Sequence, residues 1–207
     1  MSVFIVFEGG DGAGKSTQAD LLATWLEGLG REVRRTFQPG DSEVGRSLRR
    51  LLLDPAAGPV EPLAEALLYA ADKAQHVGQV VRPALQRGAI VVSDRYVDSM
   101  IAYQGAGRRL DPAEVARLAW WAVGGLTPDL TVLLDAPVAD GVGAKTERDR
   151  LEQAGWAFHE RVRGFFLELA AAAPERYLVL PARRPIPDLA AAVRERVTAL
   201  LAERAGA

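Results

Sequence analysis

The sequence predicts an α/β fold in which helices flank a doubly wound parallel sheet, built as one domain over residues 1–207. Short apolar runs alternate along the chain with longer segments of helical periodicity, and parallel strands need such crossovers. The first apolar run leads directly into a glycine-rich phosphate-binding motif. A length of 207 residues with 49% hydrophobic and 25% charged content suits one domain with a sizeable core.

Five segments are predicted as buried strands because they are short, apolar and rich in branched side chains. These strands are expected at residues 3–7, 33–37, 89–93, 130–135 and 177–181. Helical spacing fills the longer segments, which cover residues 15–29, 43–53, 62–87, 112–123, 154–172 and 186–204. In the first of them, Leu22, Leu26 and Leu29 contribute to an inward-facing stripe.

Proline and glycine residues indicate where the predicted helices are interrupted and where loops are expected. Pro83 lies inside the third helical segment and is expected to kink or end that helix. Residues 54–62 contain three prolines and a glycine, which is typical of an exposed loop. Residues 136–150 include Gly141 and Gly143 and are only weakly helical, so we expect a mobile lid segment there.

Composition excludes several classes of function. The 25 Lys and Arg against 27 Asp and Glu give a net charge of -2, which argues against nucleic acid as a partner. The absence of cysteine excludes disulfides, thiolate metal sites and cysteine nucleophiles, and only two histidines are present. The first apolar run is too short for a signal peptide or a membrane span. We therefore expect a cytoplasmic protein without a membrane partner.

The strongest motif lies between the first predicted strand and the first predicted helix. It matches the P-loop pattern of nucleotide-binding proteins, and the candidate ATP-binding residues are Gly9, Gly10, Asp11, Gly12, Ala13, Gly14, Lys15, Ser16 and Thr17. Glycines turn backbone amides toward phosphates, Lys15 reaches the β- and γ-phosphates, and the Ser16 hydroxyl can ligate Mg²⁺. A P-loop NTPase type of sheet follows.

Magnesium also needs a carboxylate at the end of another strand. Asp94 and Asp135 both qualify, and periodicity does not choose between them. Arg95 directly follows Asp94, and a cation is expected where two phosphorylated ligands approach each other, which favours Asp94. For Asp135, a strand-end residue that accepts hydrogen bonds from loop amides is the favoured interpretation.

Further motifs resemble the bacterial thymidylate kinase family along nearly the whole chain. The most specific is Asp94-Arg95-Tyr96, followed by Ser99 and by Ala102-Tyr103-Gln104-Gly105. The same resemblance extends through the segments at 68–76, 124–135, 149–152 and 158–163. It implies ATP-dependent phosphorylation of dTMP to dTDP with Mg²⁺, on a five-stranded parallel sheet, by a homodimer. The catalytic residues implied are Lys15, Arg95 and Asp94.

The resemblance also implies which residues bind the acceptor. Asp11 would approach the sugar 3′-hydroxyl or the acceptor phosphate, Arg95 would bridge the two phosphates, and Tyr103 would exclude a 2′-hydroxyl. Substrate-binding positions implied in addition are Gln38, Arg49, Tyr69, Lys73, Ser99 and Gln104. In the lid, Lys145 and Arg148 are the candidate ATP-binding cations. For Arg49, a solvated basic helix face is an equal alternative, and for Tyr69 and Tyr103 the alternative is core packing.

Three departures from the family pattern keep a second enzyme class open. Gln38, Lys73 and Met100 stand where the family commonly has glutamate, arginine and a small polar residue. A P-loop kinase for another deoxynucleotide or nucleoside is therefore the alternative. A non-catalytic nucleotide switch is a third hypothesis. The chain contains no asparagine, which argues against guanine recognition of the Asn-Lys-x-Asp kind.

Overall fold

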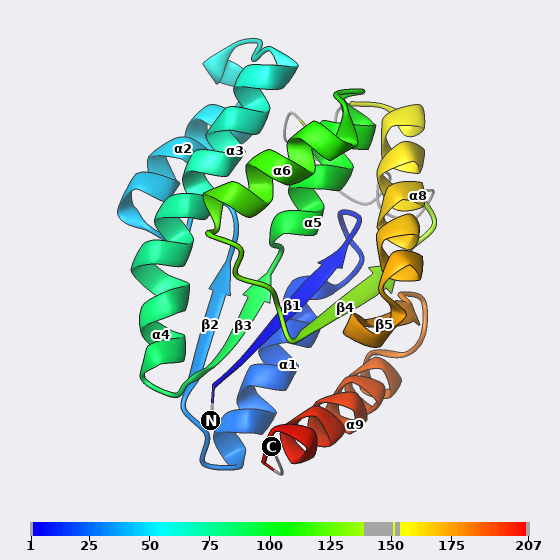
Figure 1. Cartoon of the computed structure of the whole chain (residues 1–207). Helices are drawn as coiled ribbons and strands as arrows, with labels where there is room; N and C mark the ends of the chain where they lie inside the picture. Colours follow the sequence, from blue (N-terminus) through cyan, green and yellow to red (C-terminus); the bar gives the residue numbers. More distant parts are fainter. Residues whose placement is uncertain (1, 139–150, 152–153, 206–207) are drawn as a thin grey trace.

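The computed structural model describes residues 2–138, 151 and 154–205. Its centre is a five-stranded parallel sheet in the order β2-β3-β1-β4-β5 (Figure 1). The strands are β1 (Val3–Gly9), β2 (Val33–Phe37), β3 (Ile90–Asp94), β4 (Leu130–Asp135) and β5 (Tyr177–Pro181). The predicted fold class is confirmed, because the sheet is parallel throughout and helical crossovers join its strands.

The principal helices are α1 (Lys15–Gly28), α2 (Glu43–Leu53), α3 (Pro62–His76), α4 (Arg82–Gln86), α5 (Val97–Met100), α6 (Pro112–Ala122), α8 (Trp156–Ala172) and α9 (Ile186–Ala205). Two short 3-10 turns are present: Pro55–Ala57 lies between α2 and α3, and Pro174–Arg176 lies between α8 and β5. Asp111 begins α6 by accepting a hydrogen bond from the Ala113 amide, with Pro112 in the first turn, where its missing N–H costs nothing.

Alternating side chains of β1 divide the core into two parts. Phe4 and Val6 pack with residues of α3, α5, α6 and α8 on one face of the sheet. Val3, Ile5 and Phe7 pack on the other face against α1 and α9 (Figure 1). This period of two along a central strand that is buried on both faces explains its continuous apolar sequence.

Three local features differ from the sequence-based expectations. The edge strands β2 and β5 are only partly buried. Of the two outcomes expected at Pro83, the end of the helix is wrong: the π-helical stretch Val77–Val81 leads from α3 into α4, and the proline lies in the first turn of α4. The expected kink stays a prediction. The π-helical stretch Ile101–Gly107 continues α5, a helical region that the sequence did not predict.

None of the helices within the described residues is long and apolar enough to cross a membrane. The predicted lid over residues 136–150 lies almost entirely outside the described residues.

Candidate active site

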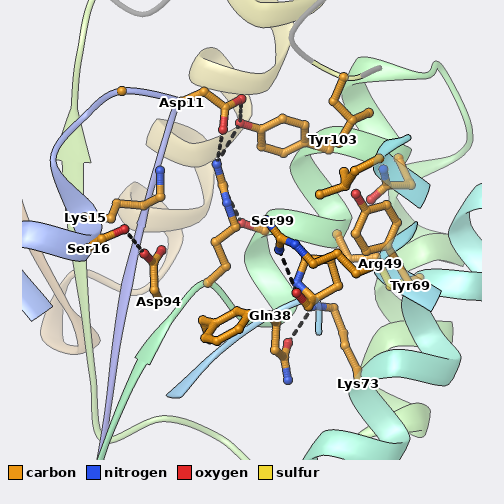
Figure 2. Close-up of a pocket in the computed structure, with 18 of the residues that line it drawn as sticks. Asp11, Lys15, Ser16, Gln38, Arg49, Tyr69, Lys73, Asp94, Ser99 and Tyr103 are labelled. Carbon is orange, nitrogen blue, oxygen red and sulfur yellow. Dashed lines mark hydrogen bonds and ion pairs between the residues drawn. The ribbon is translucent and has the colours of Figure 1, made fainter. Parts of the chain in front are cut away.

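A cavity of about 450 Å³ opens at the carboxyl ends of β1, β2 and β3 (Figure 2). The chain leaves β1 toward β2, which lies beyond β3, whereas β4 lies on the opposite side of β1. Ligands of open α/β sheets bind at such a switch in strand order. The described lining includes five basic side chains, Lys15, Arg35, Arg49, Lys73 and Arg95, against the carboxylates of Asp11 and Asp94. This excess of positive charge suits phosphorylated ligands.

The P-loop begins where β1 ends, and its glycines are required by geometry. A Cβ atom on Gly9 would lie 2.4 Å from the Leu134 carbonyl oxygen, so no side chain fits beside β4. Gly14 has a φ of 87° at the start of α1, a conformation that glycine adopts without strain. Lys15 then donates from Nζ to the Gly10 carbonyl oxygen at 2.6 Å, which folds its side chain back over the loop. Burial and the nearby Arg95 lower the pKa of Lys15 to about 8.

The two candidate carboxylates have different partners in the structure. Asp94 pairs with Phe7 at the end of β3, and its Oδ2 accepts from the Ser16 hydroxyl at 2.5 Å. Asp135 instead receives two hydrogen bonds from Arg163, at 2.6 and 2.9 Å. Arg163 of α8 thus binds both side-chain oxygens of Asp135. The expectation that loop amides bind Asp135 stays a prediction, because residues 139–150 lie outside the described residues.

Arg95 is held between the P-loop and the rest of the cavity. Its φ of 71° is left-handed and unusual for a residue with a side chain. From there the guanidinium donates to Asp11 Oδ1 at 2.5 Å, to Ser99 Oγ at 2.9 Å and to the Gly9 carbonyl oxygen at 3.1 Å. Although burial alone would raise it, the charges of Arg95 and Lys15 hold the pKa of Asp11 at about 2. Backbone strain of this kind concentrates at functional sites.

The Glu8 carboxylate accepts hydrogen bonds from residues that follow Arg95 in the chain. It is fully buried at the end of β1 and accepts hydrogen bonds from the Tyr96 amide at 2.7 Å and from the Ser99 amide at 3.2 Å. The Ser99 hydroxyl also donates to it at 2.5 Å. Ser99 therefore connects the buried Glu8 carboxylate to Arg95. The sequence did not indicate this supporting role of Glu8.

Tyr103 closes the same side of the cavity. Its hydroxyl donates to Asp11 Oδ2 at 2.9 Å, and the Arg95 guanidinium lies 5.1 Å from its ring centroid. Phe158 and Phe166 make edge contacts with the ring, with centroid separations of 5.9 and 6.3 Å. The ring is thus packed in the core and lines the cavity at once.

The far end of the cavity is formed by β2, α2 and α3. Lys73 is 2% exposed, and its Nζ donates to Gln38 Oε1 at 2.8 Å and to the Tyr96 carbonyl oxygen at 2.6 Å. Gln104 donates to the buried Glu65 at 2.8 Å, which orients its amide. Arg49 is exposed on α2, lines the cavity and donates to the Pro39 carbonyl oxygen at 2.7 Å (Figure 2).

The cavity brings most of the sequence-predicted residues together. Those in its lining are Asp11, Gly12, Lys15, Ser16, Gln38, Arg49, Tyr69, Lys73, Asp94, Arg95, Ser99, Tyr103 and Gln104. The candidates Gly9, Gly10, Ala13, Gly14 and Thr17 belong to the end of β1, the loop and the first turn of α1, beside the lining. Lys145 and Arg148 lie outside the described residues.

Sequence reasoning missed Arg35, which lines the cavity with its Nη2 atom 3.9 Å from Asp94 Oδ2. Arg35 and Phe37 share one face of β2, so a period of two along that strand could have identified the pair.

Comparisons with known proteins agree with this geometry. The family model described as "Thymidylate kinase" matches residues 7–193. A thymidylate kinase of Cutibacterium acnes is 60% identical over 96% of this chain and 98% of its own length. That of Clavibacter michiganensis subsp. michiganensis is 56% identical over 99% of both chains. A crystal structure of thymidylate kinase from Ehrlichia chaffeensis has a TM-score of 0.79 at 31% identity, covering 95% of this chain and 98% of that one. The chain therefore belongs to the thymidylate kinase family.

Proposed function

We propose a role for each side chain of the cavity in the reaction that this chain catalyses, the ATP-dependent phosphorylation of dTMP to dTDP in dTTP synthesis. One observation carries the assignment. Arg95 contacts P-loop residues on one side and Ser99 and Tyr103 on the other. ATP phosphates would lie on the P-loop beside Lys15, and the dTMP phosphate would approach from the opposite side of Arg95.

The chemistry needs positioning and charge neutralisation rather than a general base. A phosphate monoester has a second pKa near 6, so the attacking oxygen of dTMP is already ionised at neutral pH. Neither His76 nor His159 lines the described cavity. Lys15 would neutralise the donor phosphates, Arg95 would bridge donor and acceptor, and Arg49 would bind the acceptor phosphate. Such fixed cations stabilise a transition state whose charge is spread over the transferred group.

The hydrogen-bonded pair of Ser16 and Asp94 fits Mg²⁺. Magnesium prefers hard oxygen ligands and keeps several waters and substrate phosphates in its shell, so one hydroxyl and one carboxylate are a suitable protein contribution. Among the described residues no group of three or more acidic, His or Cys side chains could hold a metal ion by itself. When bound, Mg²⁺ would withdraw charge from the phosphoryl oxygens.

The remaining residues would select the acceptor. The Tyr103 ring would fill the space next to C2′ of the deoxyribose, and Tyr69 would pack near the base. Lys73 and Gln104 would face the thymine edge, where Lys73 has a third N–H to donate. Lysine recognises a base carbonyl less specifically than arginine because it lacks the planar guanidinium that donates two parallel hydrogen bonds. One hydrogen bond to the O4 of thymine is nevertheless enough to disfavour cytosine, which carries an amino group at that position.

A direct test measures ADP release with dTMP, dUMP, dCMP, dGMP and dAMP as acceptors. We expect the highest kcat/KM for dTMP and at least a tenfold lower value for dCMP, because an unmatched donor in a buried site is costly. A higher kcat/KM for any other acceptor would support the alternative kinase for a different deoxynucleotide.

A homodimer is also proposed. Apolar side chains on α2, α3 and α6 are unusually exposed: Leu51 (50%), Leu63 (61%), Leu67 (51%) and Trp121 (80%). These helices cover the same face of the sheet, where α2 and α6 both pack against α3 (Figure 1). Sedimentation equilibrium of wild type and Trp121→Glu should show a dimer and a weakened dimer; a monomeric wild type would contradict the proposal. The expected cytoplasmic location stays a prediction.

A further inference from the structure

A buried chain of hydrogen bonds runs from the far end of the cavity to the molecular surface. Lys73 Nζ lies 2.8 Å from Gln38 Oε1, and Gln38 Nε2 lies 2.7 Å from His76 Nδ1. His76 Nε2 lies 2.5 Å from Thr36 Oγ1, whose hydroxyl lies 2.6 Å from Asp41 Oδ2. The side chains from Lys73 to Thr36 are at most 3% exposed, so water does not compete for these bonds. Of these five residues, only Lys73 and Gln38 line the cavity.

Only one set of donors and acceptors satisfies the whole chain. The ammonium of Lys73 donates and never accepts, so the oxygen of the Gln38 amide must face it. The amide nitrogen of Gln38 then donates to Nδ1 of His76, which places the imidazole proton on Nε2. Nε2 donates to Thr36, and the Thr36 hydroxyl donates to Asp41. The order of donors therefore depends on a neutral His76.

The surroundings of His76 keep it neutral. The charged groups that act on it are Asp41, Lys73 and Arg34, and burial lowers the pKa of His76 to about 4. At neutral pH its Nδ1 is therefore available to accept a hydrogen bond from Gln38.

The effect reaches the cavity through Lys73. Two of its three N–H groups are taken by neutral acceptors, Gln38 Oε1 and the Tyr96 carbonyl oxygen. The remaining N–H has no partner among the described residues and belongs to a side chain that lines the cavity. If Gln38 turned by half a rotation, its NH2 would oppose the ammonium and displace it. The direction of the third N–H thus depends on the orientation of the Gln38 amide.

We propose that His76 is a positioning residue for base selection: through Gln38 it fixes Lys73, so that one N–H faces the base carbonyl of the acceptor. This inference rests on the proposed contact between Lys73 and thymine. His76 itself touches neither nucleotide. On the side of His76 away from the cavity, the hydrogen bonds of Thr36 and Asp41 favour the tautomer with its proton on Nε2.

The experiment compares dTMP with dCMP as acceptors in one ADP-release assay. The ratio of their kcat/KM values is unaffected by the fraction of folded enzyme, because both acceptors sample the same preparation. His76→Phe removes the acceptor for Gln38, and Gln38→Met removes the amide; each should lower the ratio about tenfold, the value of one hydrogen bond. In the double variant the loss should equal that of Gln38→Met alone, because both changes break the same chain.

A conservative variant separates positioning from packing. His76→Asn keeps a carbonyl oxygen close to the position of Nδ1, so we expect it to retain most of the ratio. An unchanged ratio in Gln38→Met overturns the proposal whether or not His76→Phe folds, and so do additive losses in the double variant. Lys73→Met identifies which step fails. If it also leaves the ratio unchanged, the contact between Lys73 and the base is wrong; if it alone lowers the ratio, only the role of His76 is wrong.

Discussion

Tyr103 offers a test in which two substitutions at one position separate shape from hydrogen bonding. Phe158, Phe166 and the Arg95 guanidinium all contact its ring, which is 3% exposed, so the ring cannot move aside for a 2′-hydroxyl. Overpacking of this kind costs about 1–3 kcal/mol. That range corresponds to roughly 5- to 150-fold in kcat/KM between dTMP and ribothymidine monophosphate.

Tyr103→Phe keeps the ring and removes the hydroxyl that donates to Asp11 and accepts from Arg95, so activity should fall for both acceptors by a similar factor. The lost bond to a charged carboxylate is worth about 1.5–3 kcal/mol. Tyr103→Ala opens the space and should bring the two acceptors close to parity, while lowering stability by about 3–5 kcal/mol through the cavity that it leaves.

The assay is ADP release with each acceptor for wild type and both variants, with thermal unfolding of the same samples as a control for folding. The reasoning is refuted if Tyr103→Ala preserves the preference for the deoxyribonucleotide. It is also refuted if Tyr103→Phe loses that preference as fully as Tyr103→Ala does.

Three further predictions follow from buried ionisable groups. Lys15→Ala should stay folded by circular dichroism and lose about two to three powers of ten in ADP release, because a cation at the developing charge is removed; near-normal turnover would contradict the ATP site. Glu8→Gln should lower the free energy of unfolding in urea by about 1–3 kcal/mol, since an amide cannot accept all three hydrogen bonds that Glu8 now accepts; an unchanged midpoint would argue against this support for Ser99. His76 has a pKa lowered from 6.5 to about 4, so the unfolded chain binds its proton first, and the stability that the neutral ring contributes is full above pH 6.5 and lost as the pH falls through 4. Between pH 7 and pH 4.5 the difference in unfolding free energy between wild type and His76→Asn should shrink by about 2.5 kcal/mol. The variant is subtracted because Asp98, whose pKa burial raises to about 7, changes the stability in the opposite direction over the same pH range. A difference that stays constant with pH would contradict the assignment.

Local sequence patterns were sufficient to predict the strands of the sheet and the position of the P-loop. Every predicted strand is present, and the loop lies between β1 and α1 as its pattern requires. These features depend on residues that are close in sequence, such as the glycines that allow the turn before Lys15. The helical region from Val97 to Gly107 was missed because almost every side chain in it is buried. A segment buried on all sides has no polar face from which a period of 3.6 residues can be recognised.

Roles that depend on the packing of distant elements were harder to predict. The contact of Asp94 with Ser16 depends on the register of β1 with β3, and the pairing of Asp135 with Arg163 depends on the packing of α8. Similarly, Glu8 directly precedes the P-loop motif, but its hydrogen bond with Ser99 spans 91 residues of sequence. Hydrogen bonds over such separations leave no periodic signal along the chain.

The most direct measurement is the single-turnover rate of phosphoryl transfer from ATP to dTMP by Arg95→Met, with the binding of each nucleotide measured separately. Arg95 joins the P-loop to the acceptor side of the cavity through Asp11, Ser99 and Tyr103. A folded variant should bind both nucleotides with modestly weakened affinity and transfer the phosphoryl group about two to three powers of ten more slowly. A transfer rate within a few-fold of wild type, or a loss confined to dTMP affinity, would show that Arg95 does not bridge the two phosphates.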